Sequence, residues 1–597
     1  MDGAQARLQK FVTNARSRPY VVVLVIVLYR LWVRWRSRPR NVLIPAGRHW
    51  LFKFLFGTPA EFIDTIRAVW ANQHLTYLSW LHAELGRTFA VKLPFQPWWV
   101  MTTCPNNVEH ILLNNFPNYP KGAWFTNKLS DLLGHGIFNV DGKEWYSQRK
   151  AVGHLFSATL FKEHIWTVVR QNARKLRDIL RSSSGEEPVD IFNLMNRFTL
   201  DTIGEIGFGK SIGSLEDPSS AFMRSFDAAQ RIALKRFFTP HWRLLRWLGL
   251  GSESHAKEHF SYLDDYARHV VHDLKSNIAK EDDGAKTNGI SWADIEARKS
   301  LVGLFLADAK KRGETLSEDF LRDLVMNFLI AGRDAAAHAL SWTIFCLCNH
   351  PEAAEKARRE INEICGVRGP AYEDLDSMPY LQAVIDEALR LYPSLPLDLK
   401  VTANDDTWPD GSVLPKGTVV LFNMYAMGRD SSNWGEDAAC FRPERWLEME
   451  SFPGNYVYPV FNGGPRECLG KRLAQIEMKT CLAMLLPQMT FQLAVPAEEI
   501  SHDSTMTIGM SKGLPCIVIP VEESKDAESS TSATQSETES IYSSGYSDVA
   551  DTPCEAEGGE QPSQPRKPKV PRRSGRARQR EKKRSRVSTP SPDGFGY

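Results

Sequence analysis

Residues 461–474 read FNGGPRECLGKRLA and hold one cysteine, Cys468, in a loop rich in glycine. Apolar residues at helical spacing follow this loop, so we expect the cysteine just before the start of a helix. The unpaired amide N–H groups of a helix start favour a thiolate over a thiol, and the thiolate is the form of cysteine that binds iron. The stretch therefore predicts that Cys468 is an iron ligand.

Four neighbours of this cysteine fit a flat cofactor that carries negative charge. Gly464 and Gly470 allow the backbone to turn tightly and to approach a ring closely. Arg466 offers a guanidinium group to a carboxylate such as a haem propionate, and Phe461 offers a flat apolar contact. The alternative is an ordinary buried cysteine in a glycine-rich turn.

The spacing Phe-x-x-Gly-x-Arg-x-Cys-x-Gly resembles the cysteine-ligand loop of the cytochrome P-450 family of haem-thiolate monooxygenases. The resemblance covers roughly residues 60–521 and implies a mainly helical domain with small β-sheets. It implies haem b as the cofactor and Cys468 as the axial ligand of its iron. Nothing in the chain resembles a flavin or nicotinamide domain, so we expect a separate NADPH-dependent flavoprotein reductase that docks near Lys471 and Arg472.

Three further residues resemble the family's contacts to the haem propionates. Trp145 and Arg149 stand one turn apart in an expected helix, as in the family's Trp-x-x-x-Arg pattern. Lys400 joins them by its position in a later expected strand. Taken alone, the Trp/Arg spacing also fits a surface cation that lies on a half-buried indole.

A long helix is expected from about residue 318 to 349, with FLIAGRDAAAHALSW at its centre. Gly332 in this apolar helix predicts close approach by a flat group or a local kink. The family's helix carries Ala-Gly-x-Asp-Thr-Thr, and Asp334 matches it, but Ala335 stands in place of the first threonine. The resemblance implies that the family's aspartate and threonine together deliver protons to dioxygen. Proton delivery in this chain is expected to depend on Asp334 with water, on a hydroxyl group of the substrate, or on His338. The alternative for His338 is a histidine that lies at the surface or caps a helix.

A buried ion-pair network is expected beneath the cysteine loop. Glu387 and Arg390 stand three residues apart on an apolar helix, whereas an exposed pair of this kind is usually a weak salt bridge. A buried pair needs additional hydrogen-bonding partners. The family supplies one from a Pro-x-Arg segment, and FRPERW places Arg445 there, so the resemblance implies a structural triad.

The resemblance also implies a lipid substrate. The segments NYPKG, GIFNVDG and PVFNGGPRECLGK resemble the branch that hydroxylates fatty acids or alkanes at or near the chain end. We expect one oxygen atom of dioxygen to enter a C–H bond of such a lipid. Two other classes stay open, a haem-thiolate isomerase or dehydratase of lipid hydroperoxides and a non-catalytic haem-binding protein. The residues expected to face the substrate are Leu395, Leu397, Met506 and Ile508.

The N-terminal part of the chain predicts a membrane tether. A basic segment at 1–19 precedes the apolar residues 20–33, YVVVLVIVLYRLWV, and a linker at 34–59 follows them. Fourteen helical residues reach about 21 Å, which is less than the roughly 30 Å of a hydrocarbon core. We expect the segment to span the bilayer with help from flanking Arg and Trp side chains. The alternatives are an interfacial helix or an uncleaved signal-like segment. We expect a single N-terminal anchor in the endoplasmic reticulum membrane, with the catalytic domain on the cytoplasmic side.

The composition changes after about residue 521. Residues 522–560 are acidic, rich in serine and threonine, and poor in large apolar groups, and a basic run follows at 566–586. Such a segment cannot bury enough apolar surface to fold, so a disordered tail is expected at 522–597. Attraction to an anionic membrane is a second hypothesis for the basic run, and nucleic-acid contact is the least favoured one. The net charge of +2 indicates no special partner, and nine cysteines without a Cys-x-x-Cys pair favour a reducing compartment.

Overall fold

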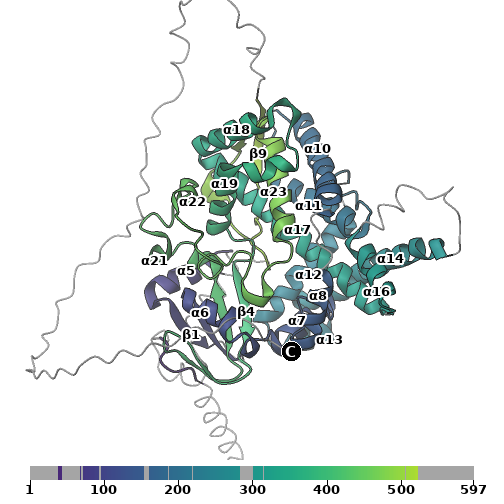
Figure 1. Ribbon diagram of the computed structural model, residues 1–597. Coiled ribbons are helices and arrows are strands. Elements are labelled where there is room, and N and C mark those ends of the chain that lie inside the picture. Colours follow the sequence, from purple (N-terminus) through teal and green to yellow (C-terminus); the bar gives the residue numbers. More distant parts are fainter. Residues whose placement is uncertain are drawn as a thin grey trace, which may run out of the picture. The chain divides into compact units, whose positions relative to one another are not determined.

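The computed structural model describes most of the chain between residues 38 and 521 (Figure 1). The basic segment 1–19, the predicted anchor 20–33 and the predicted tail 522–597 lie outside the described residues. Among the described helices, none combines the length and the apolar character that crossing a membrane requires. The described ranges are 38–43, 68, 72–92, 96–153, 160–185, 187–217, 220–282, 300–313, 315–503 and 506–521, all within one compact unit, Met1–Ala533.

The described chain is mainly helical, as the sequence predicts. The α-helices in chain order are α5 (His74–Leu85), α6 (Pro105–Glu109), α7 (Gly122–Leu133), α8 (Gly142–Gly153), α10 (Trp166–Ser182), α11 (Ile191–Phe208), α12 (Ala221–Phe238), α13 (Trp242–Leu248), α14 (Ala256–Asp282), α16 (Leu301–Lys311), α17 (Glu318–Asn349), α18 (Pro351–Cys365), α19 (Pro379–Leu391), α20 (Met424–Met427), α21 (Ser431–Trp434), α22 (Glu444–Glu448) and α23 (Lys471–Leu485). Short 3-10 and π segments include η1 (His110–Asn114), η3 (Phe161–Ile165) and η7 (Gly464–Arg466).

The long helix α17 lies at the centre of the helical part. Its bounds agree with the prediction, because the Ser317 side chain accepts a hydrogen bond from the backbone N–H of Phe320 at its start and Pro351 follows its end. Helix α11 packs along it, and a Cβ atom on Gly332 would come within 2.4 Å of the Ile203 side chain. The predicted close approach at this glycine is therefore confirmed for an aliphatic side chain of α11.

The β-strands form three small sheets. The four-stranded sheet has the order β1 (Thr88–Lys92), β2 (Trp98–Thr102), β7 (Val419–Asn423) and β4 (Leu397–Val401), the three-stranded sheet the order β3 (Val189–Asp190), β9 (Pro515–Pro520) and β8 (Met489–Leu493), and the hairpin pairs β5 (Asp406–Thr407) with β6 (Val413–Leu414). Strands β2 and β7 are parallel, and β1 and β4 flank them in antiparallel register. All residues of β2 and β7 are buried, as is typical of central strands.

The main hydrophobic core joins the long helices. Helices α10, α11, α19 and α23 contact one another or α17, and Figure 1 shows them gathered around it, with β1 and α6 toward the other end of the unit. Part of the predicted linker also packs on the domain, because Arg40 and Leu43 form isolated bridges with Val413 and Phe89. This framework places the end of η7 and the start of α23 beside α8, where the cysteine loop lies.

Candidate functional site

The cysteine loop joins η7 to α23. The backbone N–H of Cys468 donates to the carbonyl of Phe461 at 2.8 Å, which closes the loop, and α23 begins three residues later. Gly464 has φ +60°, and a Cβ atom there would lie 2.0 Å from the carbonyl oxygen of Leu112, so only glycine fits. Gly470 lies close to the sulfur, since a Cβ atom on it would be 3.8 Å from Cys468 Sγ.

Burial and local charges have opposite effects on the pKa of the Cys468 thiol. Burial raises its pKa above the ordinary value, although the Gly470 backbone hydrogen bond and the positive charge of Arg149 act in the opposite direction. The backbone hydrogen bond next to the helix start thus favours the thiolate, as predicted, but in the protein alone the effect of burial is larger. The residue as a whole is exposed, although many protein atoms surround its sulfur, and a metal cation deprotonates a thiol that it coordinates.

Two guanidinium groups lie against the indole of Trp145 on α8. The Cζ atoms of Arg466 and Arg149 are 4.5 and 5.8 Å from the ring centroid. Arg466 Nη2 donates to Asp141 Oδ1 at 2.8 Å, but its Nε is buried and has no hydrogen-bond partner among the described residues. The structure thus brings Trp145, Arg149 and Arg466 together beside Cys468 and leaves one buried donor without an acceptor.

Two lysines extend this basic group. Lys400 on β4 is buried, and its Nζ donates to Asp398 Oδ2 at 2.5 Å. Lys121 lies just before α7, and its pKa is lowered to about 7, first by burial and next by the positive charge of Lys400. Sequence reasoning missed Lys121, although it stands in the segment NYPKG that carried the resemblance to one branch of the family. A basic residue in that matched segment was the available signal.

The chemistry of this donor set fits a haem. The residues involved are the basic Lys121, Arg149, Lys400, Arg466 and Lys471 and the acidic Asp141, Asp398 and Glu467, of which Glu467 pairs with Lys471 at 3.6 Å. Five basic side chains against three acidic ones leave a net positive charge, although the ammonium group of Lys121 is only partly protonated near neutral pH. A haem carries two propionate groups, which would neutralise this excess and supply the acceptor that Arg466 Nε lacks.

The predicted triad forms a buried network between α19 and α22. The carboxylate of Glu387 accepts hydrogen bonds from Arg390 Nε at 2.7 Å and Nη2 at 2.8 Å, and Arg445 Nε lies 3.4 Å away. Trp446 Nε1 and the backbone N–H of Arg442 also donate to this carboxylate, each at 2.9 Å. The remaining Arg390 donors bind the carbonyls of Gly428, Ala438 and Cys440.

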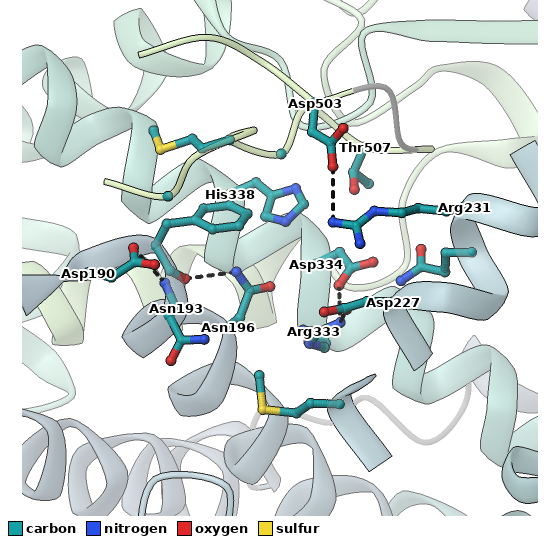
Figure 2. A pocket seen from close by; sticks show the side chains of 16 residues that line it. Asp190, Asn193, Asn196, Asp227, Arg231, Arg333, Asp334, His338, Asp503 and Thr507 are labelled. Atoms are coloured by element: carbon teal, nitrogen blue, oxygen red, sulfur yellow. Dashed lines mark hydrogen bonds and ion pairs between the residues drawn. The ribbon is translucent and has the colours of Figure 1, made fainter. Parts of the chain in front are cut away.

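The acid of α17 lies in a separate cavity of about 220 Å³, which Figure 2 shows from close by. Arg333 Nη1 is 2.5 Å from Asp227 Oδ1 and 3.2 Å from Asp334 Oδ1. The pKa of Asp334 is raised to about 6, chiefly by burial; the Arg333 charge opposes this rise and the Asp227 charge adds to it. The cavity is lined by α11, α12, α17 and residues 503–513, so the structure does not bring Asp334 to the residues around Cys468.

His338 lines the same cavity (Figure 2). It is buried and stacks on Phe192 with 5.0 Å between the ring centroids. Its pKa is lowered to about 3 by burial and then by Arg333, so the imidazole is neutral, and Nδ1 has no hydrogen-bond partner in the described chain. The alternative of a surface histidine is therefore wrong.

Ala335, which stands where the family has a threonine, has a hydroxyl group from another segment beside its backbone. Ser394 Oγ donates to the Ala335 carbonyl at 2.7 Å, and the Ser394 carbonyl accepts from the N–H of Ile508 at 3.0 Å. Ile508 is buried in the main core, and Met506 and Leu397 pack against that core. Leu395 packs instead against a second cluster that includes Trp98 and Phe422, so the four residues expected to face the substrate do not all share one cluster.

Comparisons with known proteins match most of the chain. The sequence model described as cytochrome P-450 matches residues 61–515. Cytochrome P-450 86B1 of Arabidopsis thaliana is 36% identical over 446 residues, which cover 70% of this chain and 77% of that protein. Cytochrome P-450 704C1 of Pinus taeda is 36% identical over 466 residues, which cover 73% of this chain and 88% of that protein. Cytochrome P-450 94A1 of Vicia sativa is 35% identical over 440 residues, which cover 70% of this chain and 81% of that protein. The family match spans the cysteine loop, α17 and the Glu387 network.

Proposed function

This chain belongs to the cytochrome P-450 family of haem-thiolate monooxygenases, and we propose that it inserts one oxygen atom of dioxygen into a C–H bond of a fatty acid or similar lipid near the chain end. The family match confirms the resemblance of the cysteine loop. The observation that best supports a haem site in this chain is the basic group around Trp145, with its net positive charge next to Cys468. The likeness of NYPKG and GIFNVDG to a lipid-hydroxylating branch supports the substrate class.

The residues around the cysteine would hold the cofactor. Cys468 would bind the iron, Trp145 would lie against the cofactor's edge, and the guanidinium and ammonium groups of Arg149, Arg466, Lys121 and Lys400 would neutralise the propionates. When bound, haem supplies the activation of dioxygen with two electrons, and the thiolate sulfur favours O–O cleavage. The Glu387 network would keep α19 and α22 in place beneath this loop.

The cavity beside α17 supports a route for the protons that the reaction consumes. Asp334 has a pKa of about 6, so its carboxyl group can both hold and release a proton near neutral pH. A polar cavity of about 220 Å³ has room for several water molecules. Because Ala335 has no hydroxyl group, we assign the delivery step to Asp334 with water. This cavity is separate from the residues around Cys468, so water would have to carry the proton past α17 to the cysteine side.

The source of electrons and the location of the protein are parts of the same proposal. We infer an NADPH-dependent flavoprotein reductase as the partner, and an N-terminal anchor in the endoplasmic reticulum membrane with the catalytic domain in the cytoplasm. The charges of Lys471 and Arg472 are already compensated, since Lys471 pairs with Glu467 and Arg472 pairs with Asp376 at 2.7 and 2.9 Å. Docking of the reductase through these two residues would therefore require the partner to compete with internal ion pairs.

One observation favours a second function. Ala335 in place of threonine suits an isomerase or dehydratase of lipid hydroperoxides, a reaction that needs neither dioxygen nor a reductase. Asp334 and the complete cysteine loop favour the monooxygenase instead.

The test is incubation of the full-length protein with a reductase, NADPH and a panel of fatty acids, with mass spectrometry to locate the hydroxyl group. Hydroxylated product that depends on NADPH and disappears in Cys468→Ala supports the proposal. Product from a lipid hydroperoxide without NADPH supports the second function. A bound haem without any product would leave the non-catalytic binding protein.

A further inference from the structure

A group of aromatic and basic side chains lies where α7, α12, α13 and β2 meet, apart from the cysteine loop. We call it the aromatic–basic cluster and define it by Trp99, Trp124, Lys128, Phe237 and Arg243. Trp124 lies edge-on to Trp99 and to Phe237, each with 5.5 Å between the ring centroids. The cluster thus links the four-stranded sheet to two helices that are far apart in the sequence.

Lys128 is a buried cation in this cluster. It is 7% exposed, and its Nζ lies 3.7 Å from the ring centroid of Trp124 and 5.5 Å from that of Phe237. Nζ donates to the Trp124 carbonyl at 2.6 Å, and no carboxylate among the described residues lies within ion-pair distance of it. An ammonium group has three donors, and a buried charge without a counter-ion is costly. The pKa of Lys128 is lowered to about 8, first by burial and next by the nearby charge of Arg243.

The nearest acidic residues are engaged elsewhere. Asp131, one turn after Lys128, accepts from Arg236 Nη1 at 2.7 Å and also pairs with Arg246. Glu253 binds Arg236 Nε at 2.7 Å. Arg243 forms no ion pair with a described residue, and its Cζ lies 5.3 Å from the ring centroid of Trp242. No carboxylate of the described residues therefore compensates Lys128, whereas Arg243 is exposed to solvent and adds positive charge nearby.

A second donor in the cluster lacks an acceptor. Trp99 is 3% exposed, and its indole Nε1 has no hydrogen-bond partner among the described residues. Trp124, by contrast, donates its Nε1 to Gln96 Oε1 at 3.3 Å. A buried N–H group without an acceptor costs free energy unless a ligand supplies one. Spare donors on Trp99 and Lys128 thus add to the uncompensated charge of Lys128.

We propose that the aromatic–basic cluster binds the carboxylate head of a long-chain fatty acid. This inference rests on the proposed function and narrows its substrate to the free acid. A carboxylate is a pure acceptor with one negative charge, so it compensates Lys128 and Arg243 and offers an oxygen to Trp99 Nε1. The rings of Trp124 and Phe237 bury the first methylene groups of the chain. A neutral alcohol or an alkane would leave the buried charge uncompensated.

The position of the cluster along α7 agrees with oxidation near the far end of the chain. Lys121 stands at the start of α7 in the basic group near Cys468. Lys128 follows seven residues later, which is roughly 10 Å along the helix axis. A carboxylate held at Lys128 is thereby kept away from the iron ligand, and the alkyl end is the part left to reach it.

The test compares an acid and an alcohol of equal length in the full-length holoprotein. Hexadecanoic acid and hexadecanol are titrated into wild type and Lys128→Met, which keeps the length of the side chain and removes its charge. Binding is followed by quenching of tryptophan fluorescence and, independently, by the absorption change of the haem. We expect the Kd of the acid to rise about tenfold or more in the variant, because a charge-assisted hydrogen bond is lost, while the Kd of the alcohol changes less than about twofold. Lys235→Met, at an exposed position of α12, is the matched control and should bind both ligands as wild type does.

A second variant covers the case that Lys128→Met does not fold. Arg243 is exposed, so the Arg243→Met protein should fold. Its Kd for the acid should also rise, and its Kd for the alcohol should not. An unchanged Kd for the acid in a folded Lys128→Met protein, or an equal loss for acid and alcohol, would overturn the inference. If wild type hydroxylates fatty acids while Lys128→Met binds the acid as tightly as wild type does, the proposed carboxylate site is refuted and the proposed function is not. If wild type hydroxylates no fatty acid at all, the proposed function itself fails.

Discussion

Removal of the Glu387 carboxylate should destabilise the protein severely. Glu387 is 0% exposed and accepts four hydrogen bonds of 2.7 to 2.9 Å, two of them from Arg390. In Glu387→Ala the guanidinium of Arg390, 1% exposed, would stay buried with only carbonyl oxygens as partners. Breaking such a buried pair costs about 3–5 kcal/mol, a large part of the roughly 5–15 kcal/mol that stabilises a typical domain.

The assay is chemical unfolding of purified holoprotein, followed by tryptophan fluorescence and by the carbon monoxide spectrum of the reduced protein. Glu448→Ala is the control, because its partner Arg442 is at 2.7 Å but both side chains are partly exposed, so the loss should stay below about 1 kcal/mol. Glu387→Gln, which keeps the shape and one acceptor, should fall between the two variants. A Glu387→Ala protein that unfolds within about 1 kcal/mol of wild type would refute the view that this network holds the core.

Three other predictions follow from the site. Ala335→Thr should raise the product formed per electron consumed, measured as hydroxylated lipid against NADPH oxidised, and no change there together with a harmless Asp334→Asn would exclude a proton route through this turn of α17. Asp334 has a pKa of about 6 in the folded protein and about 3.9 in an unfolded chain, so the folded state binds more protons between these values and the free energy of unfolding should fall as the pH rises from about 4 to 6. Asp334→Asn should make that fall smaller in denaturant titrations at several pH values, while Asp386, whose pKa burial also raises to about 6, keeps part of it; a slope equal to that of wild type would contradict the role of Asp334. Arg466→Ala should release haem about tenfold faster to an acceptor globin, because a buried charged donor is lost, whereas Arg368→Ala on the exposed pair with Asp374 should not.

The sequence predicted best what one segment determines by its own spacing. The bounds of α17 follow from the Ser317 cap and from Pro351, and the cysteine loop and the Glu387–Arg390 pair are short patterns on single elements. Residues in one helix or loop keep the same mutual geometry wherever the element packs. The mainly helical fold with small sheets followed from the same local signals and from the resemblance.

Contacts between distant segments were beyond local reasoning. The partner of Gly332 is Ile203, more than a hundred residues earlier, and the donors of the aromatic–basic cluster come from β2, α7 and α13. Lys121 was missed for the same reason, since only packing brings it near Lys400. The raised pKa of the Cys468 thiol depends on how many atoms surround it, which no spacing reports.

The central claim is that the sulfur of Cys468 binds the iron of a haem. The most direct measurement is the absorption spectrum of the purified, reduced protein under carbon monoxide, with Cys468→Ala as the comparison. The account predicts the long-wavelength Soret band of thiolate ligation in wild type and its loss in the variant. A wild-type spectrum without that band, or a variant that keeps it, would contradict the account.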